Sequence, residues 1–153
     1  MPRTVRPAYS YRGDPGVPKF PDDRPIVIFD GYCALCSASA QFILRNDRKG
    51  IYRLLPAQSP LGHALYRHYD LDPANYETNI LIADGVAWFK SEGNLRIAEG
   101  LGFPWSLAVI LRAVPLRLRD RLYECVARNR LRWFGARTTC FMPDPRYRDR
   151  FLA

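Results

Sequence analysis

The sequence predicts an α/β fold: a mixed four-stranded sheet flanked by helices, with extra helices toward the C-terminal end. Three observations predict it. Short apolar runs alternate with helix-forming segments in the first half of the chain, a hairpin signal follows them, and the last third is helical. The chain has 153 residues, 48% hydrophobic and 25% charged, which suits one domain with a substantial hydrophobic core.

Residues 1–25 form a proline-rich lead-in. They contain six prolines and little apolar periodicity, so we expect this segment to be largely disordered and the folded domain to span residues 26–153. The lead-in lacks the continuous apolar stretch of a secretory signal. The longest apolar run, Trp105–Leu111, is too short to cross a bilayer. We therefore expect no transmembrane segment and a cytoplasmic location, where thiols are held reduced.

The first elements of the domain alternate between strand and helix. Ile26–Phe29 is an unbroken apolar run with β-branched residues, as expected of a central strand that is covered on both faces. After a turn at Asp30-Gly31, good helix formers predict a helix over Ala34–Asn46. A second strand over Ile51–Leu55 and a second helix over Leu61–Tyr69 follow.

A β-hairpin and three helices complete the predicted order. Asn79–Ala83 and Val86–Phe89 flank Asp84-Gly85, a pair that accepts the positive φ of a tight turn. The three helices are expected over Ser91–Glu99, Trp105–Ala113 and Leu116–Arg130. This order of elements matches a thioredoxin-like fold.

The last predicted helix is amphipathic. One of its faces is mainly apolar and is expected to pack on the sheet; it comprises Leu118, Leu122, Cys125, Val126 and Asn129. The charged residues, Asp120 and Glu124 among them, are left for water. On this arrangement Cys125 is a buried, inert thiol.

The chain is basic, and its positive charge is concentrated late. Lys and Arg number 23 against 15 Asp and Glu, for a net charge of +8. Residues 112–150 contain eleven arginines and four acidic residues. Contact with an acidic partner or an anionic surface is compatible with this excess, but no nucleic-acid-binding motif accompanies it. We expect a solvated helix face and no specific nucleic-acid partner.

Cys33 and Cys36 lie at the junction between the first strand and the first helix. Their two-residue spacing lets the thiols close a small ring, and the junction in a β-α-β context favours redox chemistry over a metal site or inert thiols. Cys33 would lie at the helix start, where free N–H groups and the helix dipole favour a thiolate and lower its pKa. Cys36, one turn inside and less exposed, would resolve the mixed disulfide that Cys33 forms.

A metal site is the alternative use of these cysteines. Zinc needs about four ligands, and the other candidates form no second close pair. His63 and His68 are five residues apart, outside the i, i+4 register, and are expected on the helix surface. We therefore predict no metal and no bound cofactor, although a zinc or iron–sulfur site built from Cys33, Cys36 and Cys140 stays open.

Four further side chains are candidates for the site. Asp30 could cap the turn before the helix or relay a proton to Cys36, and the sequence does not separate these roles. Arg128, Asn129 and Arg130 could line the redox site or cap and solvate the end of the last helix.

Beyond the cysteine pair, the chain resembles the DCC family of thiol-disulfide oxidoreductases, named for the residues found here as Asp30, Cys33 and Cys36. The similarity extends to Asp47-Arg48-Lys49-Gly50, to Tyr123 and to Ala127–Arg130, Trp133-Phe134-Gly135 and a late cysteine, Cys140. The resemblance implies a thioredoxin-like domain over about Ile26–Leu152.

One departure concerns substrate binding. Thioredoxins place a cis-proline before their third strand, opposite the cysteines, but the corresponding stretch here has no proline and Thr78 is expected in its place. Cys140, in a loop after Gly135, is expected to be exposed, as a third redox partner or without a role.

These observations predict a thiol-disulfide oxidoreductase that uses Cys33 to attack and Cys36 to resolve. Its expected partners are a disulfide-containing protein or a small thiol substrate, and a reductant that the sequence does not identify. The alternative is a non-catalytic interaction domain whose basic C-terminal helix binds an acidic partner.

Overall fold

The computed structural model describes residues 7–71, 79–136, 138 and 144–152. Its centre is a four-stranded sheet in the order β2-β1-β3-β4. The strands are β1 (Ile26–Phe29), β2 (Arg53–Pro56), β3 (Ile80–Ala83) and β4 (Val86–Phe89). β1 runs parallel to β2 and antiparallel to β3, and β3 pairs antiparallel with β4. The predicted mixed four-stranded sheet is confirmed, with β2 beginning two residues later than expected.

β1 is the central strand because both of its faces are covered. All four of its residues are buried, and they alternate between two hydrophobic cores. Val27 and Phe29 belong to one core, and Ile26 and Ile28 belong to the other. The strand therefore fixes the position of the residues that follow Phe29.

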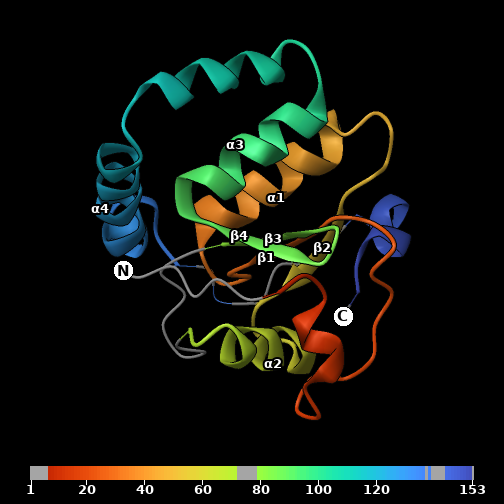
Figure 1. Cartoon of the computed structure of the whole chain (residues 1–153). Helices are drawn as coiled ribbons and strands as arrows, with labels where there is room; N and C mark the ends of the chain where they lie inside the picture. Colours follow the sequence, from red (N-terminus) through yellow and green to blue (C-terminus); the bar gives the residue numbers. More distant parts are fainter. Residues whose placement is uncertain (1–6, 72–78, 137, 139–143, 153) are drawn as a thin grey trace.

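Helices cover both faces of the sheet. Figure 1 shows α1 (Ala34–Asn46) and α3 (Lys90–Leu101) on one face and α2 (Pro60–His68) on the other. Side chains from α1 and α3 complete the core around Phe29, whereas Leu65 and Tyr66 of α2 complete the core around Ile28. The layered α/β architecture agrees with a thioredoxin-like fold.

Residues 7–25 differ from the largely disordered lead-in that we expected. Ser10–Gly13 form a short 3-10 helix, η1, and Tyr11 is buried in the same core as Ile28. His68, expected on the surface, is buried; its two ring nitrogens lie 2.8 Å from Asp14 Oδ2 and 2.8 Å from Ser10 Oγ. Aromatic side chains between the prolines give this segment apolar area to bury, and the domain boundary at residue 26 stays a prediction.

The helices after α3 differ from expectation in type and in orientation. Trp105–Ala113 is a 3-10 helix, η2, in which no residue is buried. α4 (Leu116–Phe134) runs four residues further than predicted, and Gly135 is its C-cap. Its predicted apolar face is wrong: Leu118 is 50% and Leu122 is 60% exposed, and Cys125 is also exposed.

Polar contacts explain why α4 turns its apolar residues outward. Glu124 forms an ion pair with Lys90, and Ser91 Oγ donates to Asp120 Oδ1 at 2.5 Å, so the acidic residues face α3. Ala127 and Arg130 are the residues that α4 buries. α4 is therefore attached by polar contacts at the edge of the α1/α3 layer (Figure 1).

The C-terminal residues return to the sheet. η3 (Pro145–Arg150) leads to Phe151, which pairs with Leu54 beside β2. Arg150 is buried and donates to Asp47 Oδ2 and, at 2.8 Å, to the carbonyl oxygen of Tyr52. None of the helices in the described ranges combines the length and the hydropathy that a bilayer-spanning segment needs.

Candidate active site

The site begins where β1 ends and α1 begins. Cys33 is the N-cap of α1 and has extended backbone angles, and its Sγ accepts a hydrogen bond from the Cys36 N–H at 3.3 Å. A cap residue normally supplies an oxygen for this bond, so a sulfur here places the thiol against the free N–H groups of the helix start. The predicted position of Cys33 is confirmed.

The two thiols have opposite pKa shifts. Hydrogen bonding from the Cys36 thiol, helped by the Cys36 N–H and by the charge of Arg130, lowers the pKa of Cys33 from 9.0 to about 6. The same hydrogen bond, together with burial, raises the pKa of Cys36. A thiolate at Cys33 and a protonated thiol at Cys36 are therefore the favoured pair near neutral pH.

The exposure of the thiols is the reverse of what we expected. Cys33 is fully buried, whereas Cys36 keeps 8% of its surface exposed. The backbone of Cys33 pairs antiparallel with Ala136, and the Ala34 N–H donates to the Gly135 carbonyl oxygen at 3.2 Å. The segment after α4, Gly135–Ala136, thus lies directly against the helix start, a contact that local sequence patterns do not reveal.

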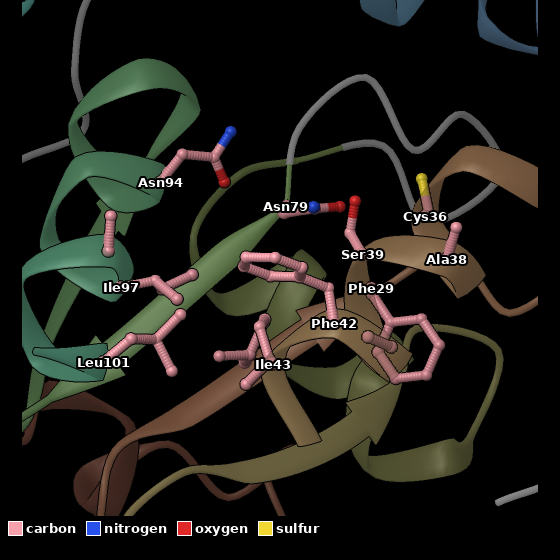
Figure 2. A pocket seen from close by; sticks show the side chains of 13 residues that line it. Phe29, Cys36, Ala38, Ser39, Phe42, Ile43, Asn79, Asn94, Ile97 and Leu101 are labelled. Carbon is pink, nitrogen blue, oxygen red and sulfur yellow. The ribbon is translucent and has the colours of Figure 1, made fainter. Parts of the chain in front are cut away.

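Cys36 reaches a cavity of about 380 Å³ between α1 and α3. Figure 2 shows its sulfur on the same upper edge as the polar ends of Ser39, Asn79 and Asn94. Below that edge the lining is apolar and includes Phe42, Ile43, Ile97 and Leu101. A mainly apolar cavity with a few polar groups at its rim is the usual form of a small-molecule or side-chain pocket.

Asp30 is buried beside the thiols and fully engaged. Its Oδ1 accepts from the Tyr32 N–H at 3.0 Å and from Gln58 Nε2 at 2.6 Å, and its Oδ2 accepts from Arg130 Nη2 at 3.2 Å. Its negative charge raises the pKa of both Cys33 and Cys36. The Asp30 carboxylate therefore opposes the Cys33 thiolate that Arg130 favours.

Gln58 is a site residue that sequence reasoning missed. Besides donating to Asp30, its Oε1 accepts from the Gly31 N–H at 3.0 Å, so one side chain holds two residues of the loop before Cys33. Gln58 follows β2, and the carboxyl ends of parallel neighbours such as β1 and β2 meet at one edge of a sheet. The parallel pairing of β1 and β2 could therefore have indicated that Gln58 lies near the cysteines.

Of the three residues predicted near the end of the last helix, the structure brings Arg130 to the cysteines. Arg130 is buried, pairs with Asp30, and donates from Nη1 to the Ala127 carbonyl oxygen at 2.7 Å. Arg128 is exposed and donates to the Glu124 carbonyl oxygen, and Asn129 donates to the Cys125 carbonyl oxygen at 2.7 Å. The side chains of Arg128 and Asn129 therefore form hydrogen bonds with the backbone of their own helix.

Two predicted residues, Thr78 and Cys140, lie outside the described residues. Within the parts that the structure does describe, no three His, Cys, Asp or Glu side chains converge as metal ligands would. The site is a dithiol at a helix start with a buried ion pair beside it. Such an arrangement can hold a thiolate and form a disulfide.

The family model of DCC1-like thiol-disulfide oxidoreductases matches residues 27–136. The chain belongs to this family. The match runs from β1 to Ala136 and so includes Asp30, Arg130 and Ala136 as well as the two cysteines.

Two curated relatives of this DCC1-like protein support the assignment. It is 35% identical to the uncharacterized protein YuxK of Bacillus subtilis over 127 residues, which cover 83% of this chain and 93% of YuxK. It is 36% identical to a chloroplastic DCC family protein of Arabidopsis thaliana over 120 residues, 78% of this chain and 70% of that one. No solved structure matches. One relative is named for a chloroplast, so location differs within the family.

Proposed function

We propose that the protein exchanges its Cys33–Cys36 dithiol with the disulfide of another molecule, with Cys33 attacking and Cys36 resolving. One observation carries the proposal: Cys33 Sγ accepts the Cys36 N–H at 3.3 Å at the helix start, where the pKa of Cys33 is lowered and that of Cys36 is raised. The attacking group in thiol-disulfide exchange is a thiolate, so the lower pKa identifies Cys33 as the nucleophile.

The exchange moves two electrons from the dithiol to the partner. The Cys33 thiolate attacks one sulfur of the partner's disulfide, forms a mixed disulfide and releases a partner thiolate. The proton of Cys36 passes to that thiolate, and Cys36 attacks Cys33 Sγ. The Cys33–Cys36 disulfide forms and the second partner sulfur leaves as a thiolate, which takes its proton from water. An external thiol or dithiol reductant then restores the dithiol, and a reducing compartment such as the cytoplasm suits this direction.

Access to Cys33 requires a local opening. Because Cys33 is fully buried and paired with Ala136, its sulfur reaches a partner only after Gly135–Ala136 moves away from the helix start. In the part of the chain that the structure describes, this segment is held to the helix start by the Ala34–Gly135 hydrogen bond and the Cys33–Ala136 pairing, so a local opening need not unfold the domain. The cavity beside Cys36 then offers room for an apolar group next to the partner's cysteine.

The test measures reduction of two disulfides, insulin and glutathione disulfide, by the pre-reduced protein. We expect Cys33→Ser to abolish reduction and Cys36→Ser to accumulate the mixed disulfide, detectable by mass spectrometry. Cys125→Ser is the matched control, because Cys125 is an exposed thiol outside the site. Unchanged reduction by Cys33→Ser contradicts the proposal.

A further inference from the structure

The outer surface of the C-terminal half is unusually apolar. Among the described residues, fourteen large hydrophobic side chains are exposed, and twelve of them lie between Phe103 and Phe134. Ile110 of η2 is 69% exposed and Leu122 of α4 is 60% exposed. Exposed apolar area concentrated in one part of a chain indicates a binding surface.

On α4 (Leu116–Phe134) four of the six exposed large apolar side chains form an ordered pattern. At about 100° per residue, four exposed apolar residues fall within about 80° of the helix circumference. They are Leu118, Leu122, Val126 and Trp133. Four exposed arginines fall within about 60° of one another on the adjacent side of the helix and form a second stripe: Arg117, Arg121, Arg128 and Arg132. We call these eight residues the outer face of α4.

The acidic side chains of this region face α3 and not the outer face of α4. Within residues 103–134, all of which are described, the acidic residues are Asp120 and Glu124, and both are engaged with the start of α3 through Ser91 and Lys90. The inward arginine Arg119 pairs with Glu92. Among the described residues none of the four outer arginines forms a salt bridge, although the charge of Arg128 helps to lower the pKa of Glu124. The outer face is therefore cationic as well as apolar.

We propose that the outer face of α4 binds the surface of an anionic lipid bilayer, with the helix lying in the plane of the interface. An exposed helix with leucine and tryptophan beside arginine is the pattern of an interfacial helix, whose apolar side chains enter the headgroup region while arginines meet anionic headgroups. A nucleic acid bound to the arginines would leave the leucines exposed to water. A second copy of the chain docked on this face would bring two arginine stripes together, and their like charges would repel.

This surface adjoins the redox site without being part of it. The buried side of α4 carries Arg130, and the chain passes from Trp133 to Gly135–Ala136, which lie against Cys33. Binding of α4 to a membrane would place the dithiol close to the interface. The proposal concerns binding alone, so it stands or falls independently of thiol exchange.

The test is sedimentation of the full chain with vesicles of phosphatidylcholine, with and without phosphatidylglycerol. We expect binding to the anionic vesicles that weakens with added salt. Arg117→Gln with Arg121→Gln should weaken it roughly thirtyfold, as each interfacial arginine contributes about fivefold. The matched control is Arg48→Gln with Lys49→Gln, which removes the same charge from an exposed turn. Leu118→Ser with Leu122→Ser should also weaken binding.

Three results overturn the proposal. The first is absence of the wild-type chain from the anionic pellet, including the case in which it self-associates through α4 instead. The second is equal loss of binding in the Arg48/Lys49 control, which would show a net-charge effect without a defined face. The third is unchanged binding in the Leu118/Leu122 variant. Circular dichroism of each variant verifies that α4 is still folded.

Discussion

Arg130 and Asp30, a hundred residues apart in the chain, form a buried ion pair of 3.2 Å beside the two thiols. The two charges act on Cys33 in opposite directions: Arg130 lowers its pKa and Asp30 raises it. The pair therefore connects α4 to the loop before α1. The balance between its two charges affects the fraction of Cys33 that is ionised.

Replacing Arg130 should disturb both the thiol and the fold. In Arg130→Met the cation that favours the Cys33 thiolate is lost and the Asp30 carboxylate is left buried without its partner. We expect the pKa of Cys33 to rise and stability to fall by about 3–5 kcal/mol, the usual cost of breaking a buried pair. The ultraviolet absorbance of the thiolate against pH, and urea unfolding, measure the two effects.

A double variant serves as the control for this prediction. In Asp30→Asn with Arg130→Met both charges are gone, so the opposed effects on Cys33 are both removed and no uncompensated charge is buried. Its stability should exceed that of Arg130→Met. An equal loss of stability in the single and double variants would show that Arg130 stabilises the fold by some means other than the ion pair.

The lowered pKa of Cys33 makes the stability of the reduced protein depend on pH. Between pH 6 and 9 the folded Cys33 is ionised, with its pKa near 6, while the unfolded thiol still holds its proton. The unfolded state binds more protons, so stability rises with pH in this window, by at most about 1.4 kcal/mol per pH unit. The gain is lost as pH falls through 6.

The measurement is urea unfolding of the reduced wild type and of Cys33→Ser at several pH values under a reductant. The difference in stability between them should grow from pH 6 to 9, because the serine hydroxyl does not titrate there. A difference that is constant across this range would mean that the pKa of Cys33 in the folded protein is close to its unfolded value.

Opening of the segment over Cys33 can be tested at Gly135. This residue has φ 87° and ψ 164°, a backbone region that glycine alone adopts easily, while its missing side chain faces open space. Gly135→Ala should therefore strain the backbone by about 1–3 kcal/mol without a steric clash. We expect faster alkylation of Cys33, with a fall in the melting temperature no larger than the several degrees that this strain corresponds to. Gly13→Ala, also in open space but within η1, is the control.

Local patterns predicted the elements that carry the dithiol, because they depend on neighbouring residues. The apolar run Ile26–Phe29 and the helix formers after Cys33 specify a strand and a helix with the cysteines between them. Contacts between distant segments were not predictable in this way. Gln58 and Ala136 reach the site through strand pairing and through the course of the chain after α4.

The orientation of α4 shows the limit of a periodicity argument. Its apolar stripe predicted a buried face, but contacts of Asp120, Glu124 and Arg130 with residues of other elements turn that stripe outward. The spacing of apolar residues shows that a helix has two faces, and only the partners of its polar residues decide which face the protein covers.

The cavity beside Cys36 should influence which disulfides the protein reduces. Ala98 on α3 lines it, and Ala98→Leu would add about three carbon atoms to a space of about 380 Å³. If an apolar group of the partner enters this cavity, the variant should raise KM for a peptide disulfide flanked by leucine and leave KM for one flanked by serine unchanged. Ala113→Leu, the same change at an exposed position of η2, should alter neither. An equal change for both peptides would place the partner's side chain elsewhere, while the exchange chemistry of Cys33 and Cys36 would still hold.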